Sequence, residues 1–77
     1  MASFVYFRKV AETGDSVEYV FGFDTDEPPR RLLVDVKSHR SRPMDGEIDY
    51  AFLKASRKIN ALREEASRWP DQGTSIS

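Results

Sequence analysis

Residues 47–69 read EIDYAFLKASRKINALREEASRW, and this stretch decides the fold that the sequence predicts. Its apolar residues recur in steps of three and four. On a helix of 3.6 residues per turn they fall within an arc of about 100°. The stripe comprises Ile48, Phe52, Ala55, Ile59, Leu62, Ala66 and Trp69. We therefore expect one amphipathic helix that Asp45 caps and that ends at Trp69, because Pro70 cannot continue it.

Three segments before the helix have the composition or the alternation of β-strands. Residues 4–11 (FVYFRKVA) are rich in aromatic and β-branched side chains, and residues 16–23 (SVEYVFGF) and 31–37 (RLLVDVK) alternate. ETGD at 12–15 favours a hairpin turn, and the prolines of DTDEPP at 24–29 interrupt a ladder. The short connections predict an α+β fold: a three-stranded antiparallel β-meander with one C-terminal amphipathic α-helix packed on one face.

The helix stripe should cover one face of this sheet and leave the other open. The covered face is expected to hold Val17, Tyr19, Phe21, Phe23, Leu32, Val34 and Val36. Residues 1–69 are expected to form a single domain, followed by a mobile C-terminal tail at 70–77. An alternative for the tail is a short edge strand at 74–77.

Length and composition exclude several classes of site. The chain has 77 residues, no cysteine and one histidine, so a disulfide, a thiolate–zinc site and an imidazole metal cluster within one chain are excluded. A second chain remains as a source of stability for so small a domain. The start, MASFVYFRKV, lacks the features of a signal peptide, so we expect a cytoplasmic protein. A net charge of −1 argues against bulk attraction to nucleic acid or acidic lipid.

The basic residues concentrate in the middle of the chain. Residues 30–44 carry a net charge of +4, whereas 1–29 carry −4 and 45–77 carry −1. The stretch KSHRSRPMDG at 37–46 continues this island. It is interpreted either as a solvated linker between a strand and the helix or as a set of phosphate contacts.

Apolar residues outside the predicted core indicate a surface for a protein partner. Patches of several hundred Å² with a polar border often mark contact sites. A second candidate lies on the outer side of the helix, where three residues follow the spacing i, i+3, i+7; the alternative is that they pack locally. The predicted partner-binding residues are Val5, Phe7, Val20, Leu33, Tyr50, Leu53 and Arg57. The sequence thus favours a non-enzymatic protein-interaction module that self-associates.

Nucleic-acid binding is the alternative function, because some DNA-binding domains place a three-stranded sheet in the major groove. Its predicted contacts are Arg31, Lys37, Arg40 and Arg42. The carboxylates of Glu18 and Asp35 among these cations oppose it.

An enzyme is disfavoured, and no cofactor is expected. Ser38 or Ser41 with His39 could form a nucleophile and a base, but neighbours on a short loop are not preorganised. We expect His39 to be a solvated loop residue. The acidic residues at 24–27 lack the glycine and the distal glutamate of a calcium loop, so no metal is expected.

Several short segments stand out: SFVYF at 3–7, the Asp45-Gly46 pair, LKASRKI at 53–59, and WP at 69–70 followed by Gly73. Through these segments most of the chain resembles a group of small uncharacterised actinobacterial proteins. This resemblance implies a cytoplasmic bacterial domain, and no activity, cofactor or ligand.

Overall fold

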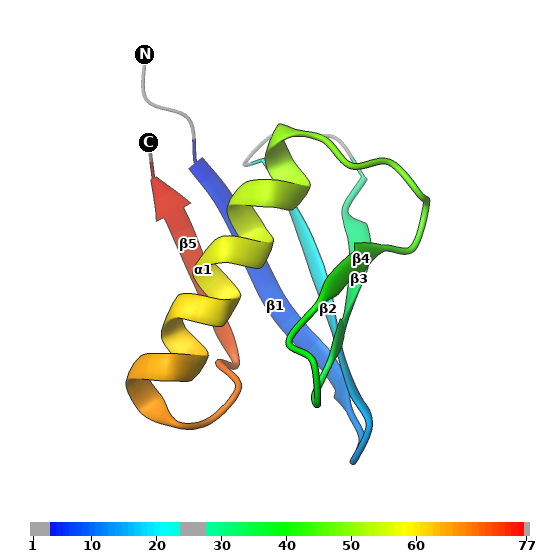
Figure 1. Ribbon diagram of the computed structural model, residues 1–77. Coiled ribbons are helices and arrows are strands. Elements are labelled where there is room, and N and C mark those ends of the chain that lie inside the picture. Colours follow the sequence, from blue (N-terminus) through cyan, green and yellow to red (C-terminus); the bar gives the residue numbers. More distant parts are fainter. Residues whose placement is uncertain (1–3, 24–27, 77) are drawn as a thin grey trace.

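The computed structural model describes residues 4–23 and 28–76, which form one antiparallel sheet and one helix. The elements are β1 (Phe4–Glu12), β2 (Ser16–Phe23), β3 (Arg30–Asp35), β4 (Ser41–Pro43), α1 (Tyr50–Ala66) and β5 (Gln72–Ile76). The strand order is β4-β3-β2-β1-β5, and α1 lies across one face of the sheet (Figure 1). The α+β class and the β1–β3 meander are confirmed, whereas the prediction of three strands and a terminal helix is only partly correct.

The β3–β4 hairpin was not predicted. Strand β3 ends two residues earlier than expected, because the Asp35 carboxylate accepts hydrogen bonds from the Lys37 backbone N–H at 3.2 Å and from the Ser38 hydroxyl at 3.0 Å. The chain then turns back, and Leu33 pairs with Arg42 in β4. Pro43 argued against a strand at this position, because proline is tolerated in a sheet mainly in edge strands, and β4 is such an edge.

The C-terminal segment is also part of the sheet. Residues 72–76 pair with β1 in antiparallel register, with Tyr6 opposite Thr74 and Phe7 opposite Gly73. The alternative prediction, an edge strand at 74–77, is therefore confirmed in part, because the strand observed spans Gln72–Ile76. As a result β1 lies inside the sheet, and β4 and β5 form its two edges.

The helix is shorter than its apolar stripe. It begins after Asp49, not Asp45: the Asp49 carboxylate accepts the Phe52 N–H at 3.0 Å. It ends at Ala66, and Ser67 follows it in a left-handed conformation (φ 59°). The predicted limits at Asp45 and Trp69 are therefore wrong, although Trp69 still reaches the core from beyond the helix end.

The core lies between α1 and the sheet face that the alternation predicts. Phe21 meets Phe52 edge to face, and Phe7 meets Tyr19 in the same way. The Tyr19 hydroxyl donates to the Pro70 carbonyl at 2.7 Å, which ties the segment after the helix to β2. The buried apolar residues of this core are Val5, Phe7, Val17, Tyr19, Phe21, Leu32, Val34, Ala51, Phe52, Ala55, Ile59 and Trp69.

No helix among the described residues is long and apolar enough to cross a membrane.

Gly73 provides a test of how tightly β5 is fitted to this core. A Cβ atom at Gly73 would lie 2.6 Å from Cζ of Phe7, a ring that is fully buried and cannot move away. Gly73→Ala should therefore lower the free energy of unfolding by about 1–3 kcal/mol through overpacking. Gly14→Ala is the control, because nothing lies within 4 Å of its Cβ position. Equal urea midpoints for the two variants would contradict the close packing of β5.

Candidate functional site

Large apolar side chains are exposed mainly where β4 leads into α1. Among the described residues, those of Met44, Ile48, Tyr50 and Leu53 are 58%, 69%, 51% and 41% exposed. We call these four residues the apolar rim. The other exposed large apolar residue of the described chain is Val10, in β1. Ile48 was predicted to lie in the core, but it precedes the helix and faces solvent.

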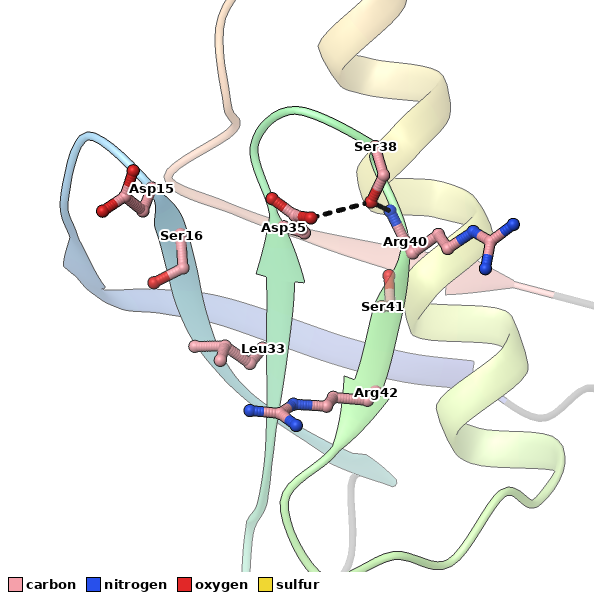
Figure 2. A pocket seen from close by; sticks show the side chains of 8 residues that line it. All are labelled: Asp15, Ser16, Leu33, Asp35, Ser38, Arg40, Ser41 and Arg42. Atoms are coloured by element: carbon pink, nitrogen blue, oxygen red, sulfur yellow. Dashed lines mark hydrogen bonds between the residues drawn. The ribbon is translucent and has the colours of Figure 1, made fainter.

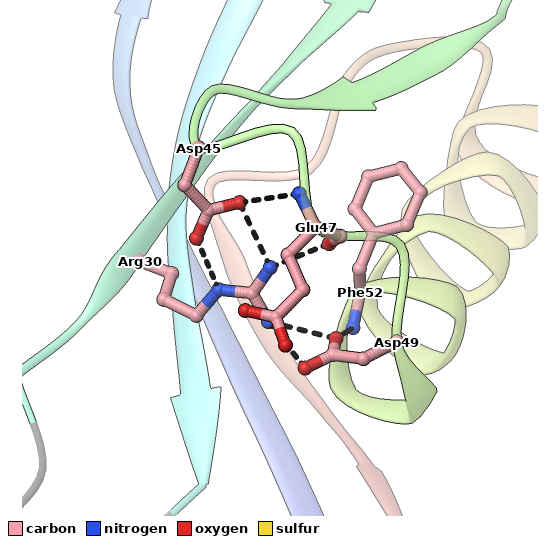
Figure 3. A network of polar contacts seen from close by, with 5 residues as sticks. All are labelled: Arg30, Asp45, Glu47, Asp49 and Phe52. Atoms are coloured by element: carbon pink, nitrogen blue, oxygen red, sulfur yellow. Dashed lines mark hydrogen bonds and ion pairs between the residues drawn. The ribbon is translucent and has the colours of Figure 1, made fainter.

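One arginine holds the backbone that carries the rim (Figure 3). Nε of Arg30 donates to the Asp45 carboxylate at 2.7 Å, and Nη1 donates to the Asp49 carboxylate at 2.7 Å. Nη2 donates to the Glu47 carbonyl oxygen at 2.6 Å. The guanidinium carbon also lies 4.9 Å from the centre of the Phe21 ring. Arg30 thereby fastens residues 45–49 to strand β3 and to the core.

The two aspartates of this network also shape their own backbone. The Asp45 carboxylate accepts the Glu47 N–H at 3.0 Å, and Gly46 takes φ 78°, a conformation that side chains disfavour. Asp49 caps the helix. The hydrogen bonds from Arg30 lower the pKa of Asp45 to about 2 and also lower the pKa of Asp49.

The predicted helix surface overlaps the apolar rim at Tyr50 and Leu53. The Tyr50 ring stacks on Phe23, with centroids 6.5 Å apart, and Lys54 Nζ lies 5.7 Å from the Tyr50 centroid. Local packing, the alternative prediction, thus occurs at Tyr50, yet half of its side chain remains exposed. Leu53 and Arg57 are exposed on the same helix. The structure therefore brings together three of the predicted partner-binding residues.

The other predicted partner-binding residues do not form an exposed patch. Val5 and Phe7 face the helix in the core, so their assignment to a contact surface is wrong. Val20 lies on the open face but is only 7% exposed, and it stands between Arg8 and Arg31 on the adjacent strands. Long arginine stems can cover apolar surface in this way. Leu33 is half-buried, so neither it nor Val20 presents a fully exposed side chain.

The four residues predicted to contact nucleic acid do not share one environment. Arg31 forms an ion pair with Glu18 at 2.6 Å. Arg42 borders a hollow of about 500 Å³ over the β2–β4 end of the sheet (Figure 2). Arg40 also borders this hollow, and the carboxylates of Asp15 and Asp35 line it. Lys37 is exposed in the β3–β4 turn. The hollow thus carries charges of both signs.

His39 makes contacts with residues at and beyond the helix. It adopts φ 60°, and its ring meets Trp69 edge to face with centroids 5.3 Å apart. Asn60 Nδ2 donates to the His39 carbonyl oxygen at 3.3 Å. The hydroxyl of Ser38 is bonded to Asp35 instead of the imidazole. His39 is thus a partly exposed loop residue, and the expectation of a solvated histidine is only partly correct.

Comparisons with known proteins supply no family. No protein-family model, no curated protein and no solved structure matches this chain. The resemblance to small actinobacterial proteins stays a prediction.

No group of three or more metal-binding side chains occurs in residues 4–23 and 28–76. The acidic turn at 24–27 lies outside the described residues.

Replacing Arg30 should destabilise the fold. Arg30→Gln removes the charge-assisted hydrogen bonds to two carboxylates, and we expect the free energy of unfolding to fall by about 1–2 kcal/mol, since both carboxylates are partly exposed. Urea unfolding measures the change. Arg40→Gln is the control, because Arg40 has no ion pair among the described residues. A loss no greater than that of the control would contradict the role of Arg30.

The same network should make stability depend on acid pH. The pKa values of Asp45 and Asp49 lie below the ordinary value of 3.8 in the folded state. Their contribution is therefore complete from about pH 5 upward and is lost progressively as the pH falls through 3.8 toward the lowered pKa values of the folded state. The difference in urea midpoint between wild type and Arg30→Gln should shrink over this range. A difference that stays constant from pH 7 to pH 2 would refute this linkage.

Proposed function

We propose that this protein is a small non-enzymatic protein-interaction module that self-associates and that binds a partner through the apolar rim. The main support for this proposal is the solvent exposure of the apolar rim. Four large apolar side chains within residues 44–53 remain 41–69% exposed, although they lie beside a well-packed core. Exposed apolar surface that is bordered by polar groups is typical of contact sites.

The backbone of the rim is suited to binding without large rearrangement. Arg30 ties Asp45, Glu47 and Asp49 to the sheet, so the connection to α1 is held before a partner arrives. A preorganised surface loses less conformational entropy on binding than a loose loop. Because the carboxylates of Asp45 and Asp49 are already paired with Arg30, their burial would not leave an isolated negative charge.

The residues beside the rim indicate the kind of protein that would fit it. Lys54 and Arg57 add positive charge to the exposed helix surface next to Tyr50 and Leu53. Tyrosine and arginine are also enriched among the residues that dominate binding energies. The complementary partner surface has an apolar centre and acidic side chains at its border.

Nucleic-acid binding remains the second candidate. Lys37, Arg40 and Arg42 are exposed and make no ion pair within the described residues, which favours it. The carboxylates of Asp15 and Asp35 around the hollow oppose it. If it holds, wild type binds mixed-sequence DNA or RNA at low salt and Arg40→Ala with Arg42→Ala does not. The absence of any complex at low salt would exclude this function.

Photo-crosslinking in the producing cell tests the apolar rim. With p-benzoylphenylalanine in place of Ile48, we expect a discrete covalent adduct with a protein, since Ile48 is the most exposed apolar side chain of the rim. Its mass distinguishes a second copy of the chain from another protein. Adding Leu53→Ser should remove the adduct.

The matched control carries the same photo-reactive residue in place of Val10, which is exposed on β1. Adducts that are equal at positions 10 and 48, or that persist after Leu53→Ser, would contradict the assignment of the rim.

A further inference from the structure

The two edges of the sheet differ in how they resist pairing with another strand. Natural proteins protect an edge by making it short or by placing charge or proline in it. Strand β4 has three residues, and two of them are Arg42 and Pro43. Strand β5 has five residues, QGTSI, without charge or proline, and its register with β1 is regular. The β5 edge therefore lacks the protection that β4 has.

The register shows which backbone groups β5 presents outward. The Lys9 N–H donates to the Asp71 carbonyl oxygen at 2.7 Å, and Lys9 stands opposite Asp71 when the β1–β5 register is continued by one residue. In an antiparallel ladder, hydrogen-bonded pairs alternate with pairs that point their N–H and C=O groups away from each other. Gly73 and Ser75 therefore bond to β1, whereas Gln72, Thr74 and Ile76 direct these groups outward. Among the described residues no strand pairs with that side.

We propose that β5 of one copy pairs antiparallel with β5 of a second copy, so that two sheets become one continuous sheet. Thr74 would lie opposite Thr74 of the second copy on a two-fold axis, and Gln72 opposite Ile76. All three outward-pointing residues then exchange hydrogen bonds with their counterparts. A two-fold axis makes such a contact self-complementary and closed at two copies. This inference deepens the proposed function, and it rests on the self-association stated there.

The helix beside β5 supports a second copy as the occupant. Leu62 lies against β5, since its Cδ1 is 3.4 Å from the Cβ position of Gly73, and Glu65 and Gln72 border one hollow beside it. Lys58 and Glu65 are seven residues apart and so share a helix face. A two-fold axis through Thr74 sets the two helices antiparallel on the same side of the sheet. Lys58 of one copy would thus approach Glu65 of the other, which is a complementary arrangement of charge.

Thr74→Pro tests the strand pairing. The Thr74 N–H points outward, so proline leaves the β1 ladder intact while it removes a central donor and places a ring at the contact. Sedimentation and light scattering should show a wild-type dimer and, for Thr74→Pro, a dissociation constant at least tenfold higher. Thr74→Val, which keeps the donor, is the matched control and should stay dimeric. Circular dichroism checks that each variant is folded.

A charge exchange provides a second test that does not depend on proline. Thr74→Lys and Thr74→Glu should each be monomeric, because like charges meet at the axis, and an equimolar mixture should form a heterodimer. If the wild type is a dimer and Thr74→Pro, Thr74→Lys and Thr74→Glu are equally dimeric, the β5 contact is overturned, but self-association is not. A strictly monomeric wild type would overturn both. Partner binding by the apolar rim is read separately, by the adduct at position 48.

Discussion

The position of the helix on the sheet depends on one arginine. Arg30 is the first residue of strand β3, and its guanidinium group lies over the Phe21 ring. The same group donates hydrogen bonds to Asp45, which precedes α1, and to Asp49, which caps it. Phe21 in turn meets Phe52 from the first turn of the helix. The same side chain therefore fixes where the helix starts and where the core begins. Because the helix starts after Asp49, the residues immediately before it are held at the surface and not in the core.

One sheet face is covered by α1, and two other parts of the described surface are the proposed contact sites. One is the apolar rim at the start of α1, and the other is the outer edge of β5 (Figure 1). They differ in chemistry, since the rim offers apolar area and β5 offers backbone hydrogen bonds. A dimer through β5 would leave both rims accessible, so a partner could bind at two linked sites with increased avidity.

The sequence predicted the elements with a strong period and missed those that depend on distant contacts. The composition of β1, the alternation of β2 and β3 and most of the helix stripe were evident, and so were Tyr50 and Leu53 on the outer helix surface. Strand β4 was hidden by a proline in a basic loop. Ile48 was misplaced because two aspartates, at positions 45 and 49, could each cap the helix, and Arg30 selects between them only in the folded chain. No local pattern signals that pairing.

Amide hydrogen exchange of the wild-type protein at low and high concentration tests the central claim most directly, because it reads each N–H of β5 separately. The amides of Gly73 and Ser75 bond to β1 and should be protected at both concentrations. Those of Gln72 and Thr74 should exchange freely when the protein is dilute and become protected when it is concentrated. Equal, rapid exchange of Gln72 and Thr74 at both concentrations would contradict pairing through β5.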